Sequence, residues 1–249
     1  MKNYKNNKEP LEFLLSKYKF DTNEIEKIST GQRYTAVLLK NGNIGVCANL
    51  GHRIDPEKNS YSNIDLKNFS HRIVLNAYFN ALLNYSHNSK SDADIFDTID
   101  FKKYKKVIML GFIKPVVKQF NEDGISITVF DFLKEDPVLT QISEQKKLLG
   151  QADVVILTST SIFNATFMDS INATKNICDI FMIGPSSIMA PELFEYKNIK
   201  MIFGATFEKF DDRVLKVIQE DGGTRRFLKF ENKGVLQKEI DESSMIGRF

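Results

Sequence analysis

Small polar residues follow directly after two apolar runs of the chain. The run Asp153–Leu157 is followed by Thr158-Ser-Thr-Ser161 and then by Asn164-Ala-Thr166. The run Asp179–Ile183 is followed by Gly184-Pro-Ser-Ser187. Hydroxyl and amide groups donate and accept hydrogen bonds, and a helix that begins beside them offers backbone N–H groups to an anion. The residue types therefore predict the binding of a small polar or anionic molecule.

Helix capping explains only part of the first segment. A cap uses one or two side chains, whereas Thr158 to Thr166 contains six hydroxyl or amide groups in nine positions. We expect Asn164 or a neighbouring hydroxyl to cap a helix from about residue 164 to 171. Ser186 and Ser187 are interpreted as hydrogen-bonding or capping residues. A serine nucleophile is not favoured, because the chain has no G-x-S-x-G motif and no histidine after residue 87.

The apolar runs predict how these segments are positioned. Unbroken apolar strands are typical of a parallel sheet covered on both faces, and ligands bind at the carboxyl ends of such strands. Strands and helices alternate through the second half, which predicts an α/β fold with a Rossmann-like, doubly wound parallel sheet. We expect strands at 106–111, 125–130, 154–157, 180–183 and 200–204, an edge strand at 224–230, and helices at 115–123, 143–149, 164–171 and 211–219.

The first part of the chain predicts a small α+β domain. Asn41-Gly42 lies between two apolar runs, a strong signal for a hairpin of strands 33–39 and 44–50. Helices are expected at 10–19 and 71–84. The acidic segment 88–100 is the predicted linker. The predicted domains are therefore 1–90 and 100–249.

Gly111 and Asp131 leave a second function open. They end two predicted strands twenty positions apart, the separation at which dinucleotide-binding folds place a glycine-rich turn and a ribose-binding acid. The turn 111–115 lacks the G-x-G-x-x-G pattern. The alternative hypothesis is an enzyme with a nucleotide-type cosubstrate, its ribose hydroxyls held by Asp131. A strand-end Asp is also common as a surface residue or a helix cap.

Composition excludes some classes of function. Lys plus Arg (34) nearly balance Asp plus Glu (32), so no overall field indicates a nucleic acid or a membrane as partner. Two distant cysteines and an N-terminus without an apolar core predict a cytoplasmic protein without a structural zinc site. The three histidines, His52, His71 and His87, form no ligand motif. Metal ligands and catalytic residues stay unassigned, and a homo-oligomer stays open.

The two polar segments resemble a known family. Ala152–Thr166 and Ile180–Phe194 are similar to two loop motifs of the putative heavy-metal chelation family, whose Rossmann-like domain follows a domain similar to the enolase N-terminal fold. Gly31–Leu50 and the predicted helix around Asn76 to Leu82 resemble that first domain. Ser159 and Ala165 stand where the family pattern usually has glycine, and both side chains are expected to crowd a ligand.

The resemblance implies a cleft between the two domains that takes a small-molecule ligand. A metal ion or a metal-chelate is the cofactor it implies, with a nucleotide as second choice, and a metal-handling accessory protein is a third hypothesis. The motif loops offer no soft metal ligands, which favours a chelate over a bare metal ion. The predicted ligand-binding residues are Thr158, Ser159, Thr160, Asn164, Thr166, Gly184, Pro185, Ser186 and Ser187, flanked by Gly111, Phe112 and Asp131, with Tyr34 and Thr35 from the first domain.

Overall fold

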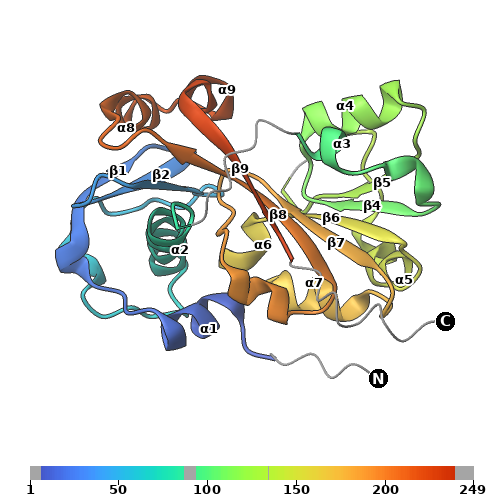
Figure 1. The fold of residues 1–249 in the computed structure, drawn as a ribbon, viewed down its shortest axis with the longest axis horizontal. Helices are drawn as coiled ribbons and strands as arrows, with labels where there is room; N and C mark the ends of the chain where they lie inside the picture. The colour runs from blue at the N-terminus through green and yellow to red at the C-terminus, as the bar shows by residue number, and fades with distance from the viewer. Residues whose placement is uncertain (1–6, 87–93, 134, 239–249) are drawn as a thin grey trace.

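Two β-sheets organise the chain. The computed structural model describes residues 7–86, 94–133 and 135–238. An antiparallel three-stranded sheet has the order β1-β2-β3, and a six-stranded sheet has the order β5-β4-β6-β7-β8-β9. Figure 1 shows the smaller sheet with α2 on one face, beside the larger α/β unit. The predicted fold class, a small α+β unit followed by a doubly wound α/β unit, is confirmed.

The first unit contains one strand that the sequence reading missed. The predicted hairpin is present, but Ile25–Thr30 forms a further strand that pairs antiparallel with the hairpin. Buried side chains alternate irregularly along this strand, so it lacks the period-two pattern of a half-buried strand. The elements of this unit are α1 (Pro10–Lys17), η1 (Thr22–Glu24), β1 (Ile25–Thr30), β2 (Tyr34–Leu39), β3 (Ile44–Ala48), η2 (Lys58–Tyr61) and α2 (Phe69–Leu83).

The second unit alternates strands and helices as predicted. Strands β5, β4, β6, β7 and β8 run parallel, and β9 pairs antiparallel with β8. Its elements are α3 (Ile95–Thr98), η3 (Phe101–Lys103), β4 (Val107–Leu110), α4 (Lys114–Glu122), β5 (Ile127–Phe130), η4 (Ile142–Glu144), α5 (Gln145–Leu149), β6 (Val154–Thr158), α6 (Thr160–Phe163), α7 (Phe167–Ala173), β7 (Asp179–Ile183), η5 (Pro191–Glu195), β8 (Ile199–Phe207), α8 (Asp212–Gln219), α9 (Thr224–Phe227), η6 (Leu228–Phe230) and β9 (Glu231–Gln237).

The strand order fixes where a ligand can enter. From β4 the chain moves outward to β5, then returns to the other side of β4 and continues through β6, β7 and β8. The connections after β4 and β6 therefore lead away in opposite directions. In doubly wound sheets the crevice at this reversal, outside the carboxyl ends of the strands, is the ligand site.

The predicted edge strand at 224–230 is wrong. This segment forms α9 and η6, and the edge strand is β9, which begins at Glu231. Phe227 is fully buried, and its ring meets those of Tyr34 and Phe207. The three-residue spacing from Phe227 to Phe230 matches one helical turn better than an alternating strand.

Two further boundaries differ from the sequence reading. The helix predicted at 164–171 begins later, as α7 at Phe167, and the short helix α6 precedes it; Ala165, with a φ of 62°, lies in the turn between the two. The predicted linker contains the helix α3, whose capping box is formed by Asp94 and Asp97. Its acidic residues thus start a helix. Residues 88–93 of that linker and His87 lie outside the described residues.

Helix α2 joins the two units through a row of polar side chains. Arg72, Asn76, Asn80 and Asn84 follow one another at intervals of four, so they share one face of the helix. All four are buried at 6% exposure or less. Asn76 donates to the Ser186 carbonyl, Asn80 to the Pro185 and Ser187 carbonyls, and Asn84 to the Ser187 and Ala205 carbonyls. The same face thus holds the turn after β7.

The row also holds the turn after β6. Arg72 donates Nε–H to the Phe163 carbonyl at 2.5 Å and Nη2–H to the Ile162 carbonyl at 2.7 Å, and it forms an ion pair with Glu9 at 2.6 Å. The last carbonyls of α6, which lack helical partners, are thereby satisfied. One apolar core continues on both sides of this row, from Leu14 and Phe79 to Leu157 and Met182.

The end of the chain returns to the first unit. Strand β8 continues beyond its parallel neighbour, and Ala205 and Phe207 pack with the hairpin residues Leu38 and Val46. Helix α8 packs on β1 and β2, as Figure 1 shows. Halfway along the β8–β9 ribbon, Gly204 pairs with Gly234. The domain limits 1–90 and 100–249 stay a prediction. Helix α8, which falls within the second of these ranges, contacts the first unit.

In the described parts of the chain, no helix combines the length and the apolar character that a membrane span requires.

Asn84 provides a test of the joint between the units. Its Oδ1 accepts the Met189 N–H at 2.7 Å, and its Nδ2 donates to two buried carbonyls. Asn84→Ala leaves these buried groups without partners, at about 1–3 kcal/mol each when unsatisfied. We expect the free energy of unfolding in urea to fall by about 2–4 kcal/mol. The exposed Asn121 of α4 is the control, and Asn121→Ala should change stability by less than about 0.5 kcal/mol. Equal losses for the two variants would contradict the role of the row.

Candidate functional site

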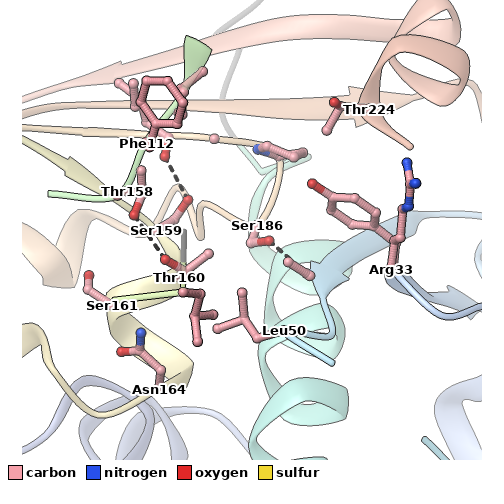
Figure 2. Close-up of a pocket in the computed structure, with 18 of the residues that line it drawn as sticks. Arg33, Leu50, Phe112, Thr158, Ser159, Thr160, Ser161, Asn164, Ser186 and Thr224 are labelled. Carbon is pink, nitrogen blue, oxygen red and sulfur yellow. Dashed lines mark hydrogen bonds between the residues drawn. The ribbon is translucent and has the colours of Figure 1, made fainter. Parts of the chain in front are cut away.

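One large cleft opens at the carboxyl edge of the parallel sheet. Its volume is about 1770 Å³, and its walls include the turns after β4, β5, β6 and β7, the hairpin of the first unit, and α9. Figure 2 shows Thr158 to Ser161 on one side and Ser186 beside them. The two polar segments predicted to share a hollow therefore face the same cleft. The geometric expectation on which the sequence reading depended is met.

The turn after β6 carries hydroxyl groups at the point between β4 and β6 where the strand order reverses. Thr158 Oγ1 and Thr160 Oγ1 are 2.9 Å apart and form a hydrogen bond. Ser159 points into the fold: its hydroxyl donates to the Ile183 carbonyl and accepts from Ser187 Oγ, each at 2.9 Å. Ser159 is 1% exposed, so its side chain fills the space between two turns. Thr158 and Thr160 also line the cleft, and their hydroxyls are the ones that this turn offers to a ligand.

Two glycines let the neighbouring strand ends approach this turn. Gly111, after β4, has a φ of +90°, and a Cβ there would lie 2.2 Å from Thr158 Oγ1. Gly184, after β7, has a φ of +125°, and its Cβ would lie 2.9 Å from Ser159 Oγ. Side chains are disfavoured at such φ values, and these positions leave no room for one. The glycines thus bring three strand ends together at the cleft.

The turn after β7 is anchored by two elements of the first unit, β3 and α2. Ser186 Oγ accepts the Ala48 N–H of β3 at 3.0 Å, and the asparagine row of α2 binds the carbonyls of residues 185–187. Neither Ser186 nor Ser187 caps the next segment, since η5 begins after Ala190 without a side-chain cap. Ser186 and Pro185 line the cleft, whereas Ser187 lies behind it. The four-residue asparagine spacing was the signal for this anchor, and the sequence reading overlooked it.

Asn164 shapes a turn and does not cap a long helix. Its Oδ1 accepts the Thr166 N–H at 3.1 Å and the Thr166 hydroxyl at 2.7 Å. Helix α6 has four residues and α7 has seven. The predicted anion site at the start of a continuous helix is therefore absent from the described fold, since a single turn carries little macrodipole. Asn164 and Thr166 still line the cleft.

Asp131 and Phe112 fix the β4 loop. The Asp131 carboxylate accepts the Phe112 N–H at 2.7 Å through Oδ2 and the Leu133 N–H at 2.8 Å through Oδ1. These bonds tie the end of β5 to the end of β4. Both residues line the cleft, and Asp131 has a structural use for each carboxylate oxygen. This is the surface or turn role that the sequence reading set beside the ribose-binding role.

Of the two hairpin residues predicted for the site, only Tyr34 lines the cleft. Its ring meets that of Phe227 edge-on at 4.8 Å, so it reaches the second unit. Burial raises the pKa of the Tyr34 phenol to about 12, which keeps the group neutral near pH 7. Thr35 is fully buried and donates to Asn49 Oδ1 at 2.8 Å. Thr35 therefore supports the hairpin from behind.

Charged residues at the cleft form a pattern that the sequence reading missed. Four exposed cations line it and form no ion pair with any described residue: Arg33, Arg53, Lys114 and Arg225. Most lining carboxylates accept hydrogen bonds from the chain itself, as in Asp55, Asp94, Asp131 and Asp221. The charge that remains available to a ligand is therefore mainly positive. No sequence motif marks these cations, because they come from four separate segments.

The side chains do not fit a heavy metal held by the protein alone. Among the described residues, no three His, Cys, Asp or Glu side chains converge in a metal-binding arrangement. Burial raises the pKa of the Cys47 thiol well above its usual range and that of Cys178 to about 12, which disfavours the thiolates that soft metals require. His52, which lines the cleft, stacks on Phe69 at 3.9 Å, and His71 Nδ1 accepts the Asp65 N–H.

Ala165 provides a test of strain at this site. Its φ of 62° lies in the left-handed region, which a Cβ disfavours. We expect Ala165→Gly to raise the free energy of unfolding by up to about 1 kcal/mol, because the removed Cβ strain exceeds the added chain entropy. Thermal unfolding measures this change. Ala173→Gly, within α7, is the control and should lose about 0.5–1 kcal/mol. A loss for Ala165→Gly as large as for Ala173→Gly would refute the strain.

Solved structures share this fold. A protein from Pyrococcus horikoshii, of the DUF364 family and with unknown function, superposes with a TM-score of 0.73 and 20% identity, over 86% of this chain and 92% of that one. A DUF364 protein from Desulfitobacterium hafniense, also with unknown function, gives a TM-score of 0.74 and 16% identity, over 92% of this chain and 97% of that one. At these identities the likeness shows the fold alone.

Sequence comparison gives the family. The uncharacterized protein MJ0500 of Methanocaldococcus jannaschii is 26% identical over 169 residues, which are 66% of this chain and 60% of that relative. The family model of DUF364, described as "Putative heavy-metal chelation", matches residues 94–237, from the start of α3 to the end of β9. The predicted resemblance is thereby confirmed, and this chain belongs to the DUF364 family.

Proposed function

We propose that the protein binds a small anionic molecule, a metal-chelate included, in the cleft at the carboxyl edge of the parallel sheet. The observation that carries this proposal is that two features occur in the same cleft. The hydroxyls of Thr158 and Thr160 lie where the strand order reverses, and cations that form no ion pair with any described residue line the same cleft. Hydrogen bonds from cations to an anion are stronger than neutral ones, so this lining favours a negatively charged ligand.

A chelate reconciles this lining with the family description. Organic chelators carry several carboxylate or phosphate-type oxygens, and they supply the metal ligands themselves. The protein then needs only to bind the anionic shell, which suits Arg33, Arg53 and Lys114. A role in heavy-metal handling would follow from binding the complex. It would not require a metal site made of cysteines or histidines.

The nucleotide alternative draws less support. Ribose hydroxyls would have to bind Asp131, and both oxygens of this carboxylate already accept backbone N–H groups. Each oxygen retains lone pairs, but the geometry gives Asp131 a sufficient structural role. Binding of a small anionic ligand is therefore better supported by the cleft than binding of a nucleotide through Asp131.

Removal of single cations tests the proposal. Calorimetric titration with citrate and with its nickel complex serves as the probe, at low and moderate salt. We expect measurable binding that weakens with added salt, and a loss of about tenfold in Lys114→Ala and in Arg53→Ala, equivalent to ~1.4 kcal/mol. Lys118 lies on the same helix as Lys114, but pairs with Glu122 at 3.0 Å and does not line the cleft. Lys118→Ala should therefore bind like the wild type, and equal losses in Lys114→Ala and Lys118→Ala would reject the cleft as the site.

The form in which a metal binds gives a second test. Because no three metal-ligating side chains converge among the described residues, we expect Ni²⁺ alone to bind more weakly than nickel citrate. Competition for Ni²⁺ with a metal-sensitive dye measures the first affinity, and titration with the preformed complex measures the second. Tight binding of bare Ni²⁺ that persists in Lys114→Ala would show that the protein chelates the metal directly.

A further inference from the structure

One arm of the cleft is lined by uncharged polar side chains. The cleft residues between positions 145 and 170 include no acidic or basic side chain. Helix α5 packs against α7, and the two contribute Gln145 and Ser170, while Ser161, Asn164 and Thr166 come from α6 and the turn after it. Charged lining residues come from other segments. Figure 2 shows Ser161 and Asn164 on the opposite side of the view from Arg33 and Thr224.

Two buried oxygens in this arm have no hydrogen-bond partner among the described residues: Ser161 Oγ and Gln145 Oε1. Ser161 is only 3% exposed. The hydroxyls next to it are satisfied, since Ser170 donates to the Thr166 carbonyl at 2.8 Å and Thr166 donates to Asn164 Oδ1 at 2.7 Å. Buried polar atoms nearly always have a partner, so an unpaired hydroxyl and an unpaired amide oxygen in one cavity need an explanation. A ligand group that pairs with them provides it.

The composition of the arm defines the chemistry of that group. The serine hydroxyl both donates and accepts, and the glutamine oxygen only accepts. No charged side chain of the arm could balance a ligand charge, and burial of an unbalanced charge is unfavourable. The matching groups are uncharged ones that both donate and accept, foremost hydroxyls. An anionic group would instead lie towards Arg33, which Figure 2 shows on the opposite side of the view.

We infer that this arm binds the hydroxyl-bearing part of the ligand, and that the ligand belongs to the anionic polyhydroxy compounds, as a sugar phosphate does. The inference rests on the proposed function, because the cations must hold the anionic end. It also assigns ligand hydroxyls to Ser161 and Gln145 in place of Asp131. A single molecule then extends from the neutral arm to the cationic wall.

Stability without ligand tests the unpaired hydroxyl. Ser161→Ala removes a buried group that gains no hydrogen bond in the free protein, so its melting temperature should stay equal to the wild-type value or rise. Ser159→Ala is the matched control, since that buried hydroxyl donates to the Ile183 carbonyl and accepts from Ser187 Oγ, and its melting temperature should fall by several degrees. If both variants lose the same stability, Ser161 has a partner within the fold and the inference is overturned.

Binding of ribose 5-phosphate, compared with inorganic phosphate, tests the arm directly. By calorimetry on the full chain we expect the sugar phosphate to bind at least about tenfold more tightly. Ser161→Ala with Gln145→Leu should remove that advantage and leave the phosphate affinity unchanged. Equal affinities for the two anions in the wild type would overturn the inference alone, with the arm holding only water. Absence of binding by either anion would overturn the inference and count against the proposed anion site as well.

Discussion

The four-residue row on α2 determines the geometry of the cleft. Arg72 holds the end of α6, and Asn76, Asn80 and Asn84 hold the turn after β7. These two turns belong to the second unit, whereas the helix belongs to the first. The bonds of the row to the carbonyls of Ile162, Phe163, Ser186, Ser187 and Ala205 are buried, so they cannot be exchanged for water without loss of stability. The cleft floor is therefore positioned by a helix more than seventy residues earlier in the chain.

Some polar side chains at the site support these anchored turns, and others face the cleft. Ser159, Ser187 and Thr35 use their hydroxyls inside the fold, while Thr158, Thr160 and Ser161 lie at the cleft surface or just beneath it. Small polar residues thus serve two purposes within one short motif. The supporting hydroxyls of Ser159, Ser187 and Thr35 are paired with a carbonyl, an amide or each other, whereas the Ser161 hydroxyl at the cleft has no partner among the described residues.

The architecture was predictable because its signals are local. Apolar runs at 154–157 and 180–183 indicated buried parallel strands, and the fold class implied that their following turns share one edge. The capping and helical breaks were not predictable in the same way. Ala165 delays the start of the expected helix through a backbone angle that its residue type does not indicate, and α9 depends on the burial of Phe227 against residues of both sheets.

The site itself was predicted in part. The hydroxyl turns were found from composition, but the cations at 33, 53, 114 and 225 come together only in three dimensions. Thr35 illustrates the opposite error, since a polar residue in a strand at the cleft can face inward when a buried partner such as Asn49 is available. Strand periodicity shows which residues lie on the same face of a sheet, but it does not show which of the two faces lines the ligand site.

The paired glycines of the β8–β9 ribbon have a mechanical consequence. Gly204 and Gly234 sit opposite each other where the ribbon passes from the parallel sheet towards the hairpin, and both line the cleft. At this pair neither residue has a side chain. Only the backbone hydrogen bonds between the two strands therefore resist twisting at this point. Twisting of the β8–β9 ribbon is therefore easiest at this glycine pair, directly beside the point where Asn84 binds the Ala205 carbonyl.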